Sequence, residues 1–94
     1  MQYTYRTRGT CSRSITFDLE GDIIKNVSFE GGCNGNLQGI SRASEGLTVD
    51  RINELFSGIR CGMKKTSCPD QLATAVRQAY EREQAEAARA DRDD

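Results

Sequence analysis

The sequence predicts an α+β fold in which a three-stranded antiparallel β-meander is followed by three helices packed on one face of the sheet. Three observations predict it. Apolar and polar residues alternate near the N-terminus, a Glu-Gly-Asp turn joins two alternating runs, and later apolar residues recur at helical spacing. A length of 94 residues argues for one domain.

The strands are expected within residues 2–8, 12–22 and 23–32, where one face of each run is apolar. These apolar positions are Tyr3 and Tyr5 in the first run, Ile15, Phe17 and Leu19 in the second, and Ile23, Val27 and Phe29 in the third. Residues 20–22 supply the turn of a β-hairpin between the second and third strands.

Three helices are expected after the glycines at 31 and 32. Gly46 ends the first, Thr48 caps the second and Gly58 ends it, and Pro69 occupies the first position of the third, with Cys68 as its N-cap. The apolar stripes are Leu37, Ile40 and Ala43, then Val49, Ile52, Leu55 and Phe56, and finally Leu72, Ala75, Val76, Ala79 and Tyr80.

The C-terminal stretch has a different composition from the rest of the chain. From Glu81 onward the apolar residues are alanines among Glu, Arg and Asp. We therefore expect a single domain over residues 1–80 and a charged helical extension over residues 81–94 that is exposed and frays.

Bulk composition excludes several classes of protein. A net charge of −1 and a pI near 5.4 give no basic footprint for nucleic acid. No apolar run is long enough to span a membrane, and the N-terminus lacks the apolar core of a signal peptide. We expect a cytoplasmic protein with no nucleic-acid or membrane partner, whose thiols are normally reduced.

The four cysteines are the candidate functional residues. Cys11, Cys33, Cys61 and Cys68 are separated by 21, 27 and 6 residues, so no C-x-x-C pair is present. Cys11, Cys33 and Cys68 are expected on loops at the ends of elements, and a helix start at Cys33 and Cys68 favours the thiolate that binds metals. Unligated thiols remain an alternative, and a Cys61–Cys68 disulfide is disfavoured in a reducing compartment.

Catalysis by this chain alone has little support. With no histidine in the sequence, general base chemistry would fall to carboxylates, lysine or a thiolate. Glu30 and Glu45 flank the segment around Cys33 and are expected to be solvated. "GGCNGN" lacks the lysine and spacing of a phosphate loop, so its glycines are expected to turn the chain from strand to helix.

The string "TSCPDQLATAV" at residues 66–76 resembles the TSCPD domain family, as does "GGCNGNLQGISRASEGLTVDRINELFSGIRCG" before it. The resemblance runs from about Thr10 to Tyr80. Members of this family occur as small stand-alone proteins and as a C-terminal domain of adenosylcobalamin-dependent (class II) ribonucleotide reductases. The resemblance implies a role in deoxyribonucleotide synthesis beside a class II reductase large subunit.

The order of cysteines, strands and helices also resembles that of the IscU/NifU-type iron–sulfur scaffold proteins. Here "GTCSRS", "EGGCNGN" and "TSCPDQLA" hold Cys11, Cys33 and Cys68 at the positions of the scaffold ligands. Two residues depart from that pattern, since Arg13 stands where the scaffolds carry aspartate and Ser67 where many carry histidine. Cys61 has no counterpart in the scaffold pattern.

These departures imply an all-thiolate site of Cys11, Cys33, Cys61 and Cys68. Four thiolates suit tetrahedral Zn²⁺, which is the expected cofactor, or an iron–sulfur cluster as the alternative. A further alternative is a redox module in which Cys61 and Cys68 exchange electrons with the reductase as a thiol–disulfide pair. The sequence leaves the oligomeric state open.

Overall fold

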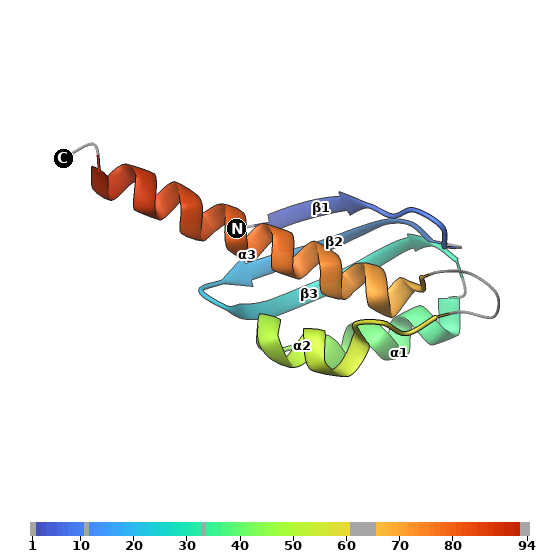
Figure 1. The fold of residues 1–94 in the computed structure, drawn as a ribbon. Helices are drawn as coiled ribbons and strands as arrows, with labels where there is room; N and C mark the ends of the chain where they lie inside the picture. The colour runs from blue at the N-terminus through green and yellow to red at the C-terminus, as the bar shows by residue number, and fades with distance from the viewer. Residues whose placement is uncertain (1, 11, 33, 61–65, 93–94) are drawn as a thin grey trace.

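Three antiparallel strands, β1 (Gln2–Arg6), β2 (Ser12–Glu20) and β3 (Ile23–Gly31), form one sheet in the order β1-β2-β3. The computed structural model describes residues 2–10, 12–32, 34–60 and 66–92. Three helices follow the sheet: α1 (Asn34–Ser44), α2 (Val49–Phe56) and α3 (Cys68–Arg92) (Figure 1). The predicted α+β fold, a meander followed by three helices, is therefore confirmed.

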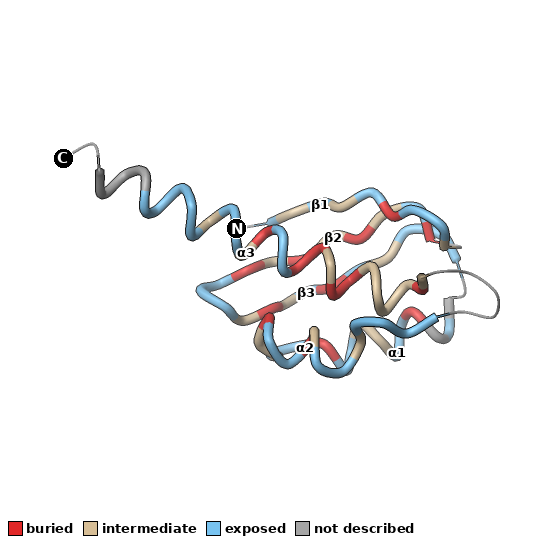
Figure 2. Tube along the Cα trace, viewed as in Figure 1, coloured by how far each residue is buried: buried red, intermediate tan, exposed pale blue. Residues whose placement is uncertain are grey.

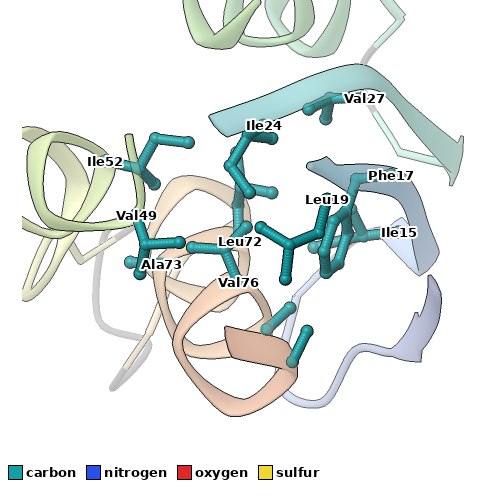
Figure 3. Close-up of a cluster of buried hydrophobic side chains, with 12 residues drawn as sticks. Ile15, Phe17, Leu19, Ile24, Val27, Val49, Ile52, Leu72, Ala73 and Val76 are labelled. Atoms are coloured by element: carbon teal, nitrogen blue, oxygen red, sulfur yellow. The ribbon is translucent and has the colours of Figure 1, made fainter. Parts of the chain in front are cut away.

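The hydrophobic core lies between the sheet and the helices (Figure 3). Ile15, Phe17 and Leu19 project from β2 as the alternation predicted, and each is at most 1% exposed. They meet the fully buried Leu72 and Val76 of α3. Ala73, Ala75 and Ala79 complete the buried face of α3, and their small side chains let this helix approach its neighbours closely.

The opposite face of the sheet is polar and open. Its side chains pair across the strands, as Thr4 with Thr16 and Ser14 with Glu30 do, in exposed hydrogen bonds. An antiparallel sheet with one covered face has this alternation of apolar and polar residues.

In β3 the inward-facing residue differs from the prediction. Ile24 is fully buried, whereas Ile23, which was expected on the apolar face, is only half-buried. The register between β2 and β3 shifts between Thr16 and Asp18, and Asn26 adopts a left-handed φ of 55°. This β-bulge reverses the alternation, so Ile24 and Val27 share the core face.

Two predicted helix positions also differ. Ala43 is exposed, and Ser44 is fully buried in its place, with its hydroxyl donating to the Ile40 carbonyl at 2.7 Å. Leu55 is 42% exposed because it lies about 60° around α2 from the buried Ile52, at the margin of the apolar stripe. Thr48 caps α2 as predicted, accepting the Arg51 N–H at 3.1 Å.

α3 is continuous through the boundary between the predicted domain and its predicted extension. Its 25 residues span about 37 Å, and the protein measures 49 Å along its longest axis against 23 and 22 Å across. Residues 84–88 are exposed, and the end of α3 projects beyond the sheet (Figure 2). Fraying of this end stays a prediction. Within the described residues, no helix has the length and apolar character that crossing a bilayer demands.

Candidate functional site

Residues from three distant segments meet at the end of the sheet where α3 begins. The Ser12 hydroxyl of β2 lies 3.1 Å from the Cys68 sulfur at the start of α3, and either atom can be the donor. Gly32, which follows β3, packs against Ser12. We refer to Ser12, Gly32 and Cys68 as the cysteine end of the molecule, because each is a cysteine or directly adjoins one in the sequence.

A second irregularity of the sheet turns Ser12 inward. In strict alternation Ser12 would share the open face with Ser14, yet Ser12 is only 4% exposed. The register between β2 and β3 shifts between these two serines, which is the mark of a β-bulge. Bulges commonly re-aim a side chain next to a functional site, and here the bulge aims the Ser12 hydroxyl at the thiol of Cys68.

The approach of Gly32 to Ser12 requires glycine. Its φ of +81° is left-handed, and a Cβ placed on Gly32 would lie 3.1 Å from the Ser12 nitrogen and 2.9 Å from Cδ1 of Leu37. Side chains larger than hydrogen are therefore excluded by both conformation and contact. This agrees with the prediction that the glycines here let the chain turn tightly.

The N-terminus of α3 is capped by Ser67, not by Cys68 as predicted. The Ser67 hydroxyl accepts the Asp70 N–H at 3.2 Å, and the Ser67 carbonyl accepts the first helical hydrogen bond, from Gln71, at 2.9 Å. Cys68 is thus the first helical residue and Pro69 the second. The buried Ser67 hydroxyl also donates to the Ile59 carbonyl at 2.6 Å, which ties the chain after α2 to the start of α3.

The carboxylate of Asp70 joins two loops. One of its oxygens accepts the backbone N–H of Gly58 at 2.7 Å, and the other accepts the hydroxyl of Thr66. The helix dipole favours this carboxylate in the first turn of α3. Every residue of Thr66–Asp70 except Pro69 therefore makes a described polar contact that fixes this corner.

Gln71 extends the same network to the loop between β1 and β2. Its side-chain oxygen accepts the Arg8 N–H at 3.1 Å, and its side-chain nitrogen donates to Thr66 at 3.1 Å. Thr66 also lies against Gly9, where a Cβ would stand 3.3 Å from the Thr66 methyl group. Contacts between residues so distant in sequence leave no local pattern from which they could be predicted.

Of the four predicted ligands, only Cys68 falls within the described part of the chain. Its thiol is free and half-buried. Cys11, Cys33 and Cys61 lie outside the described residues. Among the residues that are described, no group of three or more His, Cys, Asp or Glu side chains is arranged to hold a metal ion.

Exposed arginines surround the cysteine end. Arg6 and Arg13 line an open cavity of about 520 Å³ beside Ser12, which Glu30 also lines. Arg8 contacts Gln71 through its backbone, and Arg60 follows Ile59. None of these four arginines forms an ion pair with another described residue. Arg6, Arg8 and Arg13 come close to Cys68 only through the fold.

Comparison with models of protein families matches residues 2–80 to the TSCPD domain. No curated protein and no solved structure matches the chain.

Proposed function

The chain belongs to the TSCPD domain family, and from this premise we propose that it is a small zinc-binding domain in which Cys11, Cys33, Cys61 and Cys68 hold one ion. The observation that carries the proposal is the 3.1 Å contact between the Ser12 hydroxyl and the Cys68 sulfur.

Chain connectivity links this contact to the other cysteines. Ser12 directly follows Cys11, Gly32 directly precedes Cys33, and Ser12 touches both Gly32 and Cys68. Since consecutive Cα atoms are about 3.8 Å apart, contact among these neighbours is what a site shared by Cys11, Cys33 and Cys68 requires.

The fourth ligand is supported by the loop that holds Cys61. Ile59, two residues before it, is bonded to Ser67, and Thr66 and Gly58 are both bonded to Asp70. The two ends of the segment that carries Cys61 are thus tied to the first turn of α3, next to Cys68.

The donor set suits zinc. The chain has no histidine, so four thiolates are the soft ligands it offers, and zinc accepts such a set in tetrahedral geometry at about 2.3 Å. The buried hydroxyl of Ser12 can donate to a Cys68 thiolate, and an outer contact of this kind supports a metal ligand. Bound zinc would contribute on the order of 10 kcal/mol to folding, a large term for a core of this size.

We assign this domain a non-catalytic role beside a class II ribonucleotide reductase large subunit in the cytoplasm. The resemblance of Thr66–Asp70 and the preceding segment to the reductase-associated domains supports this role. Binding of the purified domain to such a large subunit, measured by calorimetry, tests it, and failure to bind with or without zinc would contradict it.

Elemental analysis of protein purified without chelator, paired with a count of reactive thiols, tests the metal site. We expect one zinc per chain, thiols protected until the zinc is removed, and loss of zinc in the Cys68→Ser variant. A folded, metal-free protein with four reactive thiols would contradict the proposal.

Two other results would replace zinc with one of the alternatives. Visible absorption after anaerobic reconstitution, with iron in place of zinc, would indicate an iron–sulfur cluster. A Cys61–Cys68 disulfide that forms reversibly at a cellular potential would indicate the redox role.

A further inference from the structure

The two edges of the sheet are protected to different extents. Along β3, the segment between α1 and α2 pairs with the strand: Ile24 donates to the Leu47 carbonyl at 2.8 Å, and Gly46 donates to the Ile24 carbonyl at 2.8 Å. The bulge at Asn26 interrupts the same edge. No described segment pairs with the outer edge of β1, which contains neither proline nor bulge. Exposed edges of this kind accept another strand.

The register shows which groups of β1 face this open edge. Thr7 donates to the Arg13 carbonyl at 3.1 Å, directly across from it, so Thr7 bonds inward to β2. Hydrogen-bonded pairs alternate along an antiparallel ladder, which makes Tyr3 and Tyr5 inward-bonding as well. The N–H and C=O groups of Gln2, Thr4 and Arg6 consequently point outward.

A groove of about 670 Å³ runs along this strand, between β1 and α3. Tyr3 and Tyr5 line it from the helix side of the sheet and Thr4 and Arg6 from the open side, so the groove follows the edge itself. Ala75 and Ala79 of α3 form part of its wall.

Charge is divided between the two ends of the groove. At the start of β1 the Tyr3 hydroxyl donates to the Glu83 carboxylate at 2.8 Å, and Glu81 and Arg82 of the same turn of α3 line the groove there. At the other end of β1 lie the exposed Arg6 and Arg8. The end beside α3 therefore has a small net negative charge, from two carboxylates and one guanidinium, and the other end is basic.

We propose that the open edge of β1 binds the β1 strand of a second copy of this chain, antiparallel, about a two-fold axis at Thr4. The sequence of β1 around Thr4 is Tyr-Thr-Tyr, which reads the same in both directions. Thr4 then pairs with its equivalent, Gln2 pairs with Arg6 of the partner subunit, and Tyr3 lies opposite Tyr5 of the partner subunit. Aromatic and threonine pairs of this kind stabilise antiparallel strands, and no like charges stand directly opposite.

The charges favour a second copy over an acidic peptide. Antiparallel pairing brings the acidic end of each groove to the basic end of the other, so Glu81 of one chain approaches Arg8 of the partner subunit at both ends of the seam. A uniformly acidic strand would meet Glu81 and Glu83 at one end with like charge. The result is a sheet of six described strands in which the two cysteine ends lie at opposite ends of the seam.

Analytical ultracentrifugation from about 1 µM to about 1 mM tests this pairing. Wild-type protein is expected to show a monomer–dimer equilibrium. Thr4→Pro removes the outward N–H of Thr4 and leaves the β1–β2 ladder intact, and it should weaken dimerisation at least tenfold. Thr4→Ala keeps that N–H and should dimerise like the wild type.

A charge exchange tests the orientation of the pairing without proline. Arg8→Glu and Glu81→Lys each place two repulsive contacts in a homodimer, so each variant alone should be largely monomeric. When the two variants are mixed, the substituted side chains bring opposite charges together at one end of the seam, and the native contact between Arg8 and Glu81 is kept at the other end. A heterodimer should therefore form. Glu54→Lys, an equal charge change on α2 away from the groove, should have no effect.

A wild-type protein that is monomeric at the highest concentration overturns the proposal. Dimers that persist in Thr4→Pro and in both charge variants overturn it as well, because the contact then lies elsewhere. Failure of the mixed charge variants to associate, when the wild type does, overturns the antiparallel arrangement.

Discussion

The hydroxyl of Ser12 lies 3.1 Å from the sulfur of Cys68, although the two residues are 56 positions apart in the sequence. A β-bulge turns the serine inward, and the cap at Ser67 fixes the helix start that carries the thiol. The contact therefore depends on both ends of the domain, and it gives a direct way to test the candidate site.

Ser12→Ala should release zinc about tenfold faster than the wild type to a competing chelator, because a thiolate ligand loses its supporting hydrogen-bond donor. The rate can be followed with a coloured zinc indicator. Ser14→Ala, which removes a hydroxyl that faces Glu30 on the open side of the sheet, is the matched control and should match the wild type. Equal release rates in all three proteins would show that Ser12 does not support the ligand.

Gly32→Ala should destabilise the fold more than Gly21→Ala does. Both glycines have left-handed φ values, +81° and +62°, so both substitutions introduce backbone strain of about 1 kcal/mol or more. Only at Gly32 does the added methyl group meet neighbouring atoms, those of Ser12 and Leu37, whereas nothing lies within 4 Å at Gly21. We expect the difference in unfolding free energy, measured by urea denaturation, to exceed about 1 kcal/mol. Equal losses would mean that the approach to Ser12 is not tight.

Asp70→Asn should lower the unfolding free energy by about 1–3 kcal/mol, because a charged acceptor shared by Gly58 and Thr66 is replaced with a neutral amide. Asp50→Asn is the control: Asp50 is also acidic in the first turn of a helix, but it is exposed and makes no described side-chain hydrogen bond. It should cost less than about 1 kcal/mol through the helix dipole alone. Urea denaturation of both variants gives the comparison, and similar losses would contradict the linking role of Asp70.

Tyr3 should ionise far above its ordinary range. Burial, followed by the hydrogen bond to Glu83 and the nearby carboxylate charges, raises the pKa of Tyr3 from 10.0 to about 12. The neutral phenol is favoured in the folded state, so its stabilising effect is complete below pH 10 and is lost as the pH rises toward 12. Ultraviolet difference spectroscopy in a Tyr5→Phe, Tyr80→Phe background isolates the Tyr3 signal.

In that background, Glu83→Gln should lower the pH at which Tyr3 ionises, because it removes the carboxylate that accepts the phenolic proton. The remaining burial should still hold the pKa of Tyr3 above its ordinary value. An unchanged titration would contradict the Tyr3–Glu83 contact.

Local sequence patterns predicted the strands and helices. Most of the differences between the predicted and observed buried residues of the strands arise at β-bulges. Alternation placed Ile15, Phe17 and Leu19 correctly because β2 is the central strand and has one covered face. It failed at Ile23 because the bulge at Asn26, a single residue of positive φ, reverses the faces of β3. Asparagine adopts a positive φ more readily than most residues, but apolar alternation alone does not reveal the bulge.

In the candidate site, too, features set by local sequence were predicted, and contacts between distant segments were not. The start of the last helix was predicted to within one residue from Pro69 and Asp70, whose chemistry is local. The inward turn of Ser12 and the bonds of Gln71 to Arg8 depend on how distant segments pack, and these contacts became visible only in the fold.

The pairing of the segment between α1 and α2 with β3 also limits how large an assembly can become. A sheet with two open edges can add copies at both sides and grow into a fibre, whereas here the β3 edge is partly covered by the pairing at Ile24 and interrupted by the bulge at Asn26. Because the two-fold pairing uses the β1 edge of both partners, the proposed dimer has only the two partly covered β3 edges at its sides. In the proposed dimer, the backbone hydrogen bonds of Ile24 would therefore limit further growth of the sheet, on the edge opposite to the one that pairs.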